Sequence, residues 1–118
     1  MMYYCNMYSK ELLKGTLQPI ILSMLSETDK MYGYEIFTKV KERSDGKIIL
    51  KDGSLYPVLQ KMSKDGVLQF EEVHIGKRVR KYYFLTSKGS EVKRDYLQEL
   101  KDFLETINKV VYKSAVSV

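Results

Sequence analysis

The sequence predicts an α+β fold, a winged helix-turn-helix followed by a long C-terminal helix. Within residues 16–66, apolar residues recur at three- and four-residue spacing in three successive segments. The pattern then changes to two runs rich in Val, Tyr and Phe, at 70–73 and 79–85, joined by a turn with a glycine. Three helices followed by a β-hairpin are typical of a winged helix-turn-helix, and helical spacing returns after residue 86.

The composition is that of one globular domain. The chain has 118 residues, of which 44% are hydrophobic and 30% charged, enough for one modest core. Its net charge of +5 favours an anionic partner, either nucleic acid or an anionic membrane surface. The single cysteine, Cys5, excludes an intramolecular disulfide, and neither a membrane-spanning run nor a signal peptide is recognisable. We therefore expect a cytoplasmic protein without a membrane partner.

The first two helices are expected before residue 46. Residues 1–10 are rich in Tyr and Met without a clear period, which fits either a frayed arm or a dimer contact. A helix is expected over about 16–26, with Thr16 as its N-cap. A second helix is expected over about 32–43, and Gly46 suits the left-handed residue that ends it.

The third helix, from residues 51–52 to Gly66, has two distinct faces. Leu55, Val58, Leu59 and Met62 follow the spacing of a buried face. The opposite side carries hydroxyl, amide and ammonium groups, which is typical of a helix that reads DNA, although an ordinary amphipathic surface helix fits equally well. For Tyr56, the alternative to a DNA contact is half-buried packing against the first helix. The candidate DNA contacts on this helix are Ser54, Tyr56, Gln60, Lys61 and Lys64.

The hairpin carries a concentration of positive charge. Lys77, Arg78, Arg80 and Lys81 fall within five positions, where they could neutralise phosphates or enter the minor groove. The same sequence would be found in a hairpin that uses its charged residues only to keep its exposed edge from pairing with other strands. Beside an outward-facing polar helix, the DNA-binding interpretation is favoured. The strands are expected to bury either Phe70, Tyr83 and Leu85 or the opposite face, Tyr82 and Phe84.

The last helix, capped by Thr86, carries an apolar seam longer than the winged domain needs. Since such a stripe must be buried, a second copy of the helix is the simplest partner, and intramolecular packing is the alternative. A two-fold dimer would place two reading helices about 34 Å apart on a palindromic site. We assign 1–86 to the winged domain with its arm and 87–118 to a dimerisation helix. The seam comprises Val92, Tyr96, Leu100, Phe103, Ile107 and Val110.

Catalytic or metal chemistry is not expected. His74 is the only histidine and Cys5 the only cysteine, so no common zinc-ligand set can form. The sequence contains no nucleophile elbow, phosphate-binding loop or dinucleotide fingerprint. We therefore expect a protein that is not an enzyme and needs no metal or cofactor.

Five blocks in the expected order resemble the PadR family of bacterial transcriptional regulators, and the resemblance runs from about residue 11 to 107. It implies a homodimeric winged-helix repressor, often released from its operator by a small molecule. The recognition helix would fall on 54–64 and the wing on 73–81. The blocks are Leu12-Leu13-Lys14-Gly15-Thr16-Leu17, Tyr32-Gly33-Tyr34-Glu35-Ile36, Gly53-Ser54-Leu55-Tyr56-Pro57-Val58-Leu59, Asp65-Gly66-Val67-Leu68, and Arg80-Lys81-Tyr82-Tyr83-Phe84-Leu85-Thr86 with Gly89.

The chain departs from the family pattern in two places. In the wing, Lys77 replaces a glycine and Val79 a proline, which implies a more basic tip. Family members that hold flat aromatic ligands use a tryptophan in the last helix, whereas this chain has none and Tyr96 is the nearest substitute. The missing tryptophan speaks against this flat-ligand mode, while the resemblance itself implies a small hydrophobic or aromatic effector as a partner. The alternative function is a small-molecule sensor or protein-interaction module with weak DNA contact, whose pocket the N-terminal arm could line.

Overall fold

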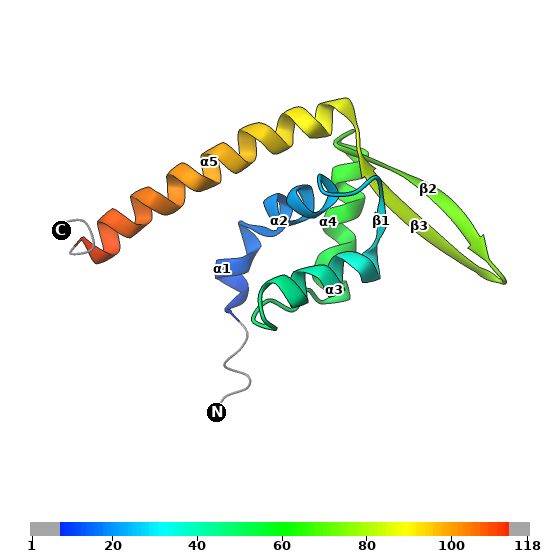
Figure 1. Ribbon diagram of the computed structural model, residues 1–118, viewed down its shortest axis with the longest axis horizontal. Coiled ribbons are helices and arrows are strands. Elements are labelled where there is room, and N and C mark those ends of the chain that lie inside the picture. Colours follow the sequence, from blue (N-terminus) through cyan, green and yellow to red (C-terminus); the bar gives the residue numbers. More distant parts are fainter. Residues whose placement is uncertain (1–7, 114–118) are drawn as a thin grey trace.

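The computed structural model describes residues 8–113 and confirms the predicted winged helix-turn-helix with a C-terminal helix (Figure 1). Most of the predicted N-terminal arm, residues 1–7, lies outside the described part. The helices that precede the hairpin form a compact body, the hairpin projects from one side of it, and the last helix extends from the other. The elements are α1 (Lys10–Lys14), α2 (Leu17–Leu25), β1 (Met31–Tyr32), α3 (Gly33–Arg43), α4 (Asp52–Lys64), β2 (Leu68–Ile75), β3 (Arg78–Leu85) and α5 (Ser87–Tyr112).

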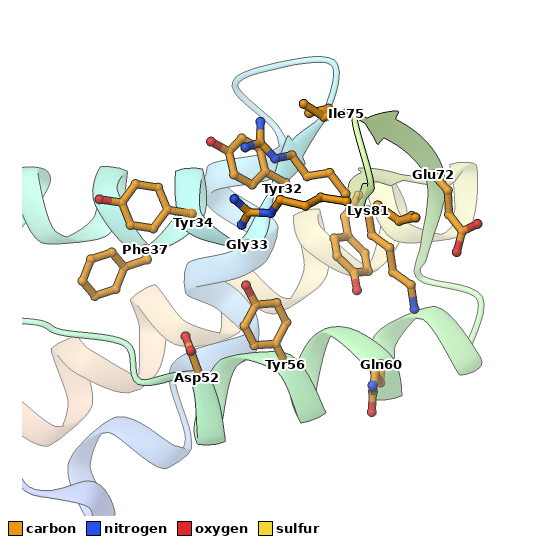
Figure 2. Close-up of a pocket in the computed structure, with 14 residues that line it drawn as sticks. Tyr32, Gly33, Tyr34, Phe37, Asp52, Tyr56, Gln60, Glu72, Ile75 and Lys81 are labelled. Atoms are coloured by element: carbon orange, nitrogen blue, oxygen red, sulfur yellow. The ribbon is translucent and has the colours of Figure 1, made fainter.

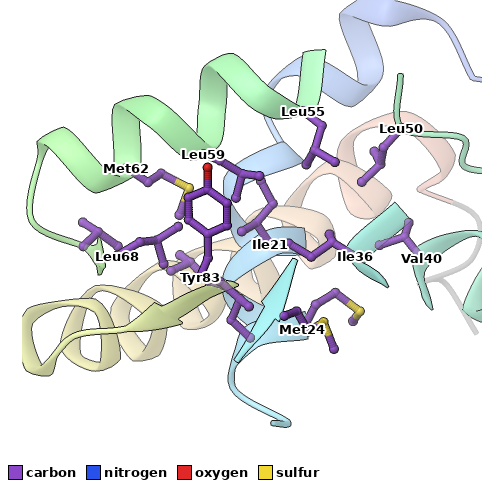
Figure 3. Close-up of a cluster of buried hydrophobic side chains, with 14 residues drawn as sticks. Ile21, Met24, Ile36, Val40, Leu50, Leu55, Leu59, Met62, Leu68 and Tyr83 are labelled. Atoms are coloured by element: carbon purple, nitrogen blue, oxygen red, sulfur yellow. The ribbon is translucent and has the colours of Figure 1, made fainter. Parts of the chain in front are cut away.

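The core lies where α2, α3 and α4 meet the base of the hairpin (Figure 3). Ile21 and Leu22 of α2, Ile36 of α3 and Leu59 of α4 have no exposed surface. Leu59 lies on the predicted buried face of α4, where Val58 is only half-buried. Burying one such aliphatic side chain stabilises the fold by about 1.5–3 kcal/mol. This packing fixes which side of each helix faces solvent.

The hairpin is longer and tighter than expected. The strands pair in antiparallel register from Leu68 opposite Leu85 to Ile75 opposite Arg78, so only Gly76 and Lys77 remain for the turn. The predicted five-residue connection from His74 to Arg78 is therefore wrong. Gly76 has φ +63°, a conformation that a two-residue turn demands and that glycine adopts without strain.

One face of the hairpin supplies a single aromatic ring to the core. Tyr83 is buried and Leu85 is half-buried, so the first of the two predicted faces is the inward one. Phe70 is a correction, because 40% of its surface remains exposed. It lies opposite Tyr83 in the register, and the two ring centroids are 5.6 Å apart. Phe70 therefore packs beside Tyr83 on the same face of the hairpin, with part of its ring in solvent.

Two short elements, α1 and β1, were not expected from the sequence. Helix α1 begins where Leu12 N–H donates to Ser9 Oγ at 3.3 Å. Strand β1 pairs with β3, with Met31 opposite Tyr83 and Tyr32 opposite Tyr82, so the sheet has the order β1-β3-β2. The predicted N-cap role of the Thr16 side chain is wrong, because its hydroxyl donates to the Leu13 carbonyl at 3.0 Å instead.

The first turn of helix α5 is fixed to the helical body, whereas its C-terminal end lies away from it. The Thr86 hydroxyl accepts from Gly89 N–H at 2.9 Å, which confirms the predicted cap. Gly89 lies so close to the Val67 carbonyl oxygen that any larger residue would clash with backbone. The first half of the helix packs against α2, and the second half extends beyond the body (Figure 1). Among residues 8–113, no helix is both long and apolar enough to cross a membrane.

Candidate nucleic-acid interface

An open groove of about 1030 Å³ lies between α4, the beginning of α3 and the wing formed by β2 and β3 (Figure 2). Strand β1 pairs with Tyr82 and Tyr83, so within residues 8–113 no strand pairs with the outer edge of β3 at 78–81, which lies beside the groove. The predicted reading helix and the predicted basic wing therefore border one concave surface. Its lining residues from the two elements are Asp52, Tyr56 and Gln60 on α4 and Arg78, Val79, Arg80 and Lys81 on β3.

All the candidate contacts on α4 are exposed. Ser54, Gln60, Lys61 and Lys64 face solvent because the opposite side of the helix is packed into the core. Gln60 lies at the groove, whereas the other three lie outside its lining. A serine hydroxyl in the first turn of a helix is suited to an anion, since the free N–H groups there point the same way.

One of the lysines on α4 has a competing partner. Lys61 Nζ donates to Asp65 Oδ2 at 2.9 Å, one helical turn away. This hydrogen bond lowers the pKa of the Asp65 carboxyl, which therefore remains an anion at neutral pH. A phosphate must displace or share this carboxylate to bind Lys61. Both side chains are exposed, so the ion pair is weak.

Tyr56 combines packing with exposure. Its ring packs against Gly33 at the start of α3, and 39% of its surface is exposed. Burial raises the pKa of its phenol, so the hydroxyl stays protonated and can donate a hydrogen bond. In Figure 2 the ring points from α4 toward the α3 and wing side of the groove.

Gly33→Ala is expected to weaken DNA binding by displacing this ring. A Cβ at residue 33 would lie 2.5 Å from the Tyr56 hydroxyl oxygen, and the three atoms nearest to it all belong to this side chain, which must therefore move. We expect an affinity loss of about fivefold, the scale of one displaced hydrogen bond, with little loss of thermal stability. Fluorescence anisotropy with duplex DNA and a thermal melt measure the two effects.

Gly15→Ala is the matched control, because nothing lies within 4 Å of a Cβ there. In a Tyr56→Ala background, Gly33→Ala should have no further effect on binding. An equal loss in both backgrounds would show that the substitution does not act through the tyrosine.

The four wing cations do not form one cluster. Side chains alternate along a strand, so Arg78 and Arg80 lie on one face of β3 and Lys81 lies on the other, while Lys77 is in the turn. The Arg80 guanidinium lies 4.0 Å from the centre of the Tyr32 ring. Lys81 Nζ lies 4.6 Å from the centre of the Phe70 ring. His74 is exposed on β2.

Three aromatic residues at the groove were missed by the sequence reasoning. Tyr32, Tyr34 and Phe37 line its α3 side, and the Tyr34 and Phe37 rings are stacked with centroids 5.8 Å apart. The signal was the Tyr32-Gly33-Tyr34 block. Aromatic residues around a glycine at a helix start suggest a close approach to this glycine.

The predicted seam on α5 is divided into two parts. Val92 and Tyr96 pack partly buried against the chain's own core. Leu100 is half-buried, whereas Phe103, Ile107 and Val110 are 55%, 38% and 71% exposed. Intramolecular packing therefore accounts for the first part, and the dimer assignment of the seam stays a prediction.

Comparison with known proteins gives relatives that are described as transcriptional regulators. The model of the transcriptional regulator PadR-like family matches residues 21–95. An uncharacterised protein of Lysinibacillus sphaericus is 32% identical over 104 residues, covering 86% of this chain and 94% of the relative. A transcriptional regulator of Clostridium thermocellum is 27% identical with a TM-score of 0.80, covering 86% and 99% of the two chains. A PadR-like regulator of Bacillus cereus is 30% identical with a TM-score of 0.72, covering 86% and 97%.

Proposed function

The chain belongs to the PadR-like family of transcriptional regulators, and on that premise we propose that it is a homodimeric repressor of a palindromic operator. The family's members act as DNA-binding regulators and not as enzymes. The groove carries the proposal, because α4 and the basic edge of β3 border the same concave surface. A net charge of +5 adds a general attraction to the phosphate backbone.

The groove suggests a division of roles among the candidate residues. Gln60 is suited to pair with adenine in the major groove, and Tyr56 to donate to a base edge or phosphate. Ser54, Lys61 and Lys64 are suited to the phosphates that flank α4. Lys77, Arg78, Arg80 and Lys81 are suited to phosphates or to the minor groove beside it.

The second half of α5 supports the homodimer. The apolar side chains of Phe103, Ile107 and Val110 are exposed on one long helix, and a second copy of this helix would remove them from water. A small hydrophobic or aromatic effector that releases the operator would bind between the two subunits, close to Tyr96. Such a regulator works in the cytoplasm, where the DNA is.

Binding to the promoter of the protein's own gene at varied salt tests this function. We expect tight binding to the promoter duplex and at least about a thousandfold weaker binding to a shuffled duplex of the same length. A plot of log affinity against log salt concentration should fall steeply, and each phosphate neutralised should add about one unit to the magnitude of its slope. Equal affinity for both duplexes would contradict sequence-specific regulation and favour a sensor or interaction module.

A further inference from the structure

The outer face of the sheet, opposite the core, carries an alternating cluster of cations and aromatic rings. Arg80 lies over the Tyr32 ring at 4.0 Å, and the Tyr32 and Tyr82 rings meet edge to face with centroids 5.3 Å apart. Lys30 lies 5.4 Å from the centre of the Tyr82 ring and forms an ion pair with Glu71. The cluster connects the wing to the start of α3.

Tyr32 is the most firmly held member of this cluster. It lies directly opposite Tyr82 in the β1–β3 ladder, so its backbone is fixed to the wing. It is also the residue before α3, where its N–H donates to Glu35 Oε1 at 3.1 Å. Since both ends of the residue are anchored, its ring is a rigid platform at the border of the groove.

We propose that Tyr32 is a positioning residue for DNA binding, whose ring holds the Arg80 guanidinium ready for a phosphate at the groove. This inference rests on the proposed function. Both residues line the groove, and the contact joins the wing to the helix-turn-helix body. A guanidinium that lies on a ring keeps its N–H donors at its edges, where they remain available to an anion.

The advantage of the ring is preorganisation. An arginine on a free strand edge samples many rotamers, and ordering it on DNA costs affinity. The Tyr32 ring restricts Arg80 before DNA arrives, and a hydrogen bond with the Tyr82 side chain raises the pKa of Arg80, which stays charged. Arg78, on the same face near the turn, is exposed and has no ring platform within residues 8–113. We therefore expect Arg80→Ala to weaken binding more than Arg78→Ala does.

The test uses the full chain and a duplex covering the promoter of its own gene. Tyr32→Leu, which removes the ring but keeps apolar bulk, should lower affinity by about two- to fivefold, the scale of one cation–π contact. Its salt dependence should match the wild type, because no charge is lost. Tyr32→Phe, which keeps the ring, should bind like the wild type. In an Arg80→Ala background, Tyr32→Leu should have no further effect.

Arg80→Lys gives a second measurement that leaves Tyr32 intact. It keeps the charge but replaces the planar fork, so we expect affinity to fall by about two- to fivefold at an unchanged salt slope. The inference is overturned if Tyr32→Leu or Arg80→Lys binds like the wild type while Arg80→Ala is weaker. It is also overturned if Tyr32→Leu weakens binding equally with and without Arg80, which would indicate a merely structural role. A wild-type chain that does not prefer the promoter overturns the proposed function as well.

Discussion

Replacing Arg78 and Arg80 together by alanine is expected to lower promoter affinity by about 100-fold at physiological salt. A hydrogen bond from a charged donor contributes about 1.5 kcal/mol or more, and each arginine would lose at least one such bond to phosphate. The slope of log affinity against log salt should fall by about two units, because two phosphate contacts are removed. Anisotropy titrations at several salt concentrations measure both quantities.

Lys10→Ala with Lys14→Ala is the matched control for this pair. Both lysines are exposed at the ends of α1, outside the groove lining, and their loss changes the net charge by the same amount. The control should bind almost like the wild type. If both double variants lost affinity equally, net charge alone would explain binding, and the wing assignment would be wrong.

Phe103→Asp with Ile107→Asp is expected to separate the dimer and abolish tight operator binding. Both side chains are exposed on the second half of α5, and two buried carboxylates at a helix–helix contact are strongly unfavourable. Since a dimer gains affinity by engaging two half-sites at once, a monomer should bind about 100-fold more weakly or worse. Sedimentation velocity and promoter titration together measure the two effects.

Thr106→Asp with Asn108→Asp adds the same charge to exposed positions outside the predicted seam. This control should remain a dimer and keep most of its affinity. A wild-type chain that sediments as a monomer at micromolar concentration would refute the seam. So would a Phe103→Asp, Ile107→Asp variant that still forms a dimer.

Local chemistry explains why much of the fold could be read from the sequence. The inward face of α4 follows from the spacing of Leu55, Leu59 and Met62, and the start of α5 follows from the Thr86 hydroxyl. Gly66 ends α4 with φ +79°, as a residue after a helix often does. Each of these features depends on residues a few positions apart.

Contacts between distant residues could not be read in the same way. Strand β1 has only two residues and exists because Met31 and Tyr32 pair with a strand about fifty residues later. The contact between Arg80 and the Tyr32 ring follows from that register, because Tyr32 lies opposite Tyr82 on the same face of the sheet as Arg80. The exposure of Phe70 depends on where the hairpin leaves the body, and no periodicity carries that information.

A footprint of the wild-type protein on the promoter of its own gene tests the central claim most directly. If two copies of the groove read a palindromic operator, two protected half-sites should appear, related by a dyad and with centres about 34 Å apart. Hydroxyl-radical cleavage resolves such a pattern at the level of single nucleotides. Uniform cleavage along the promoter at saturating protein would contradict the account.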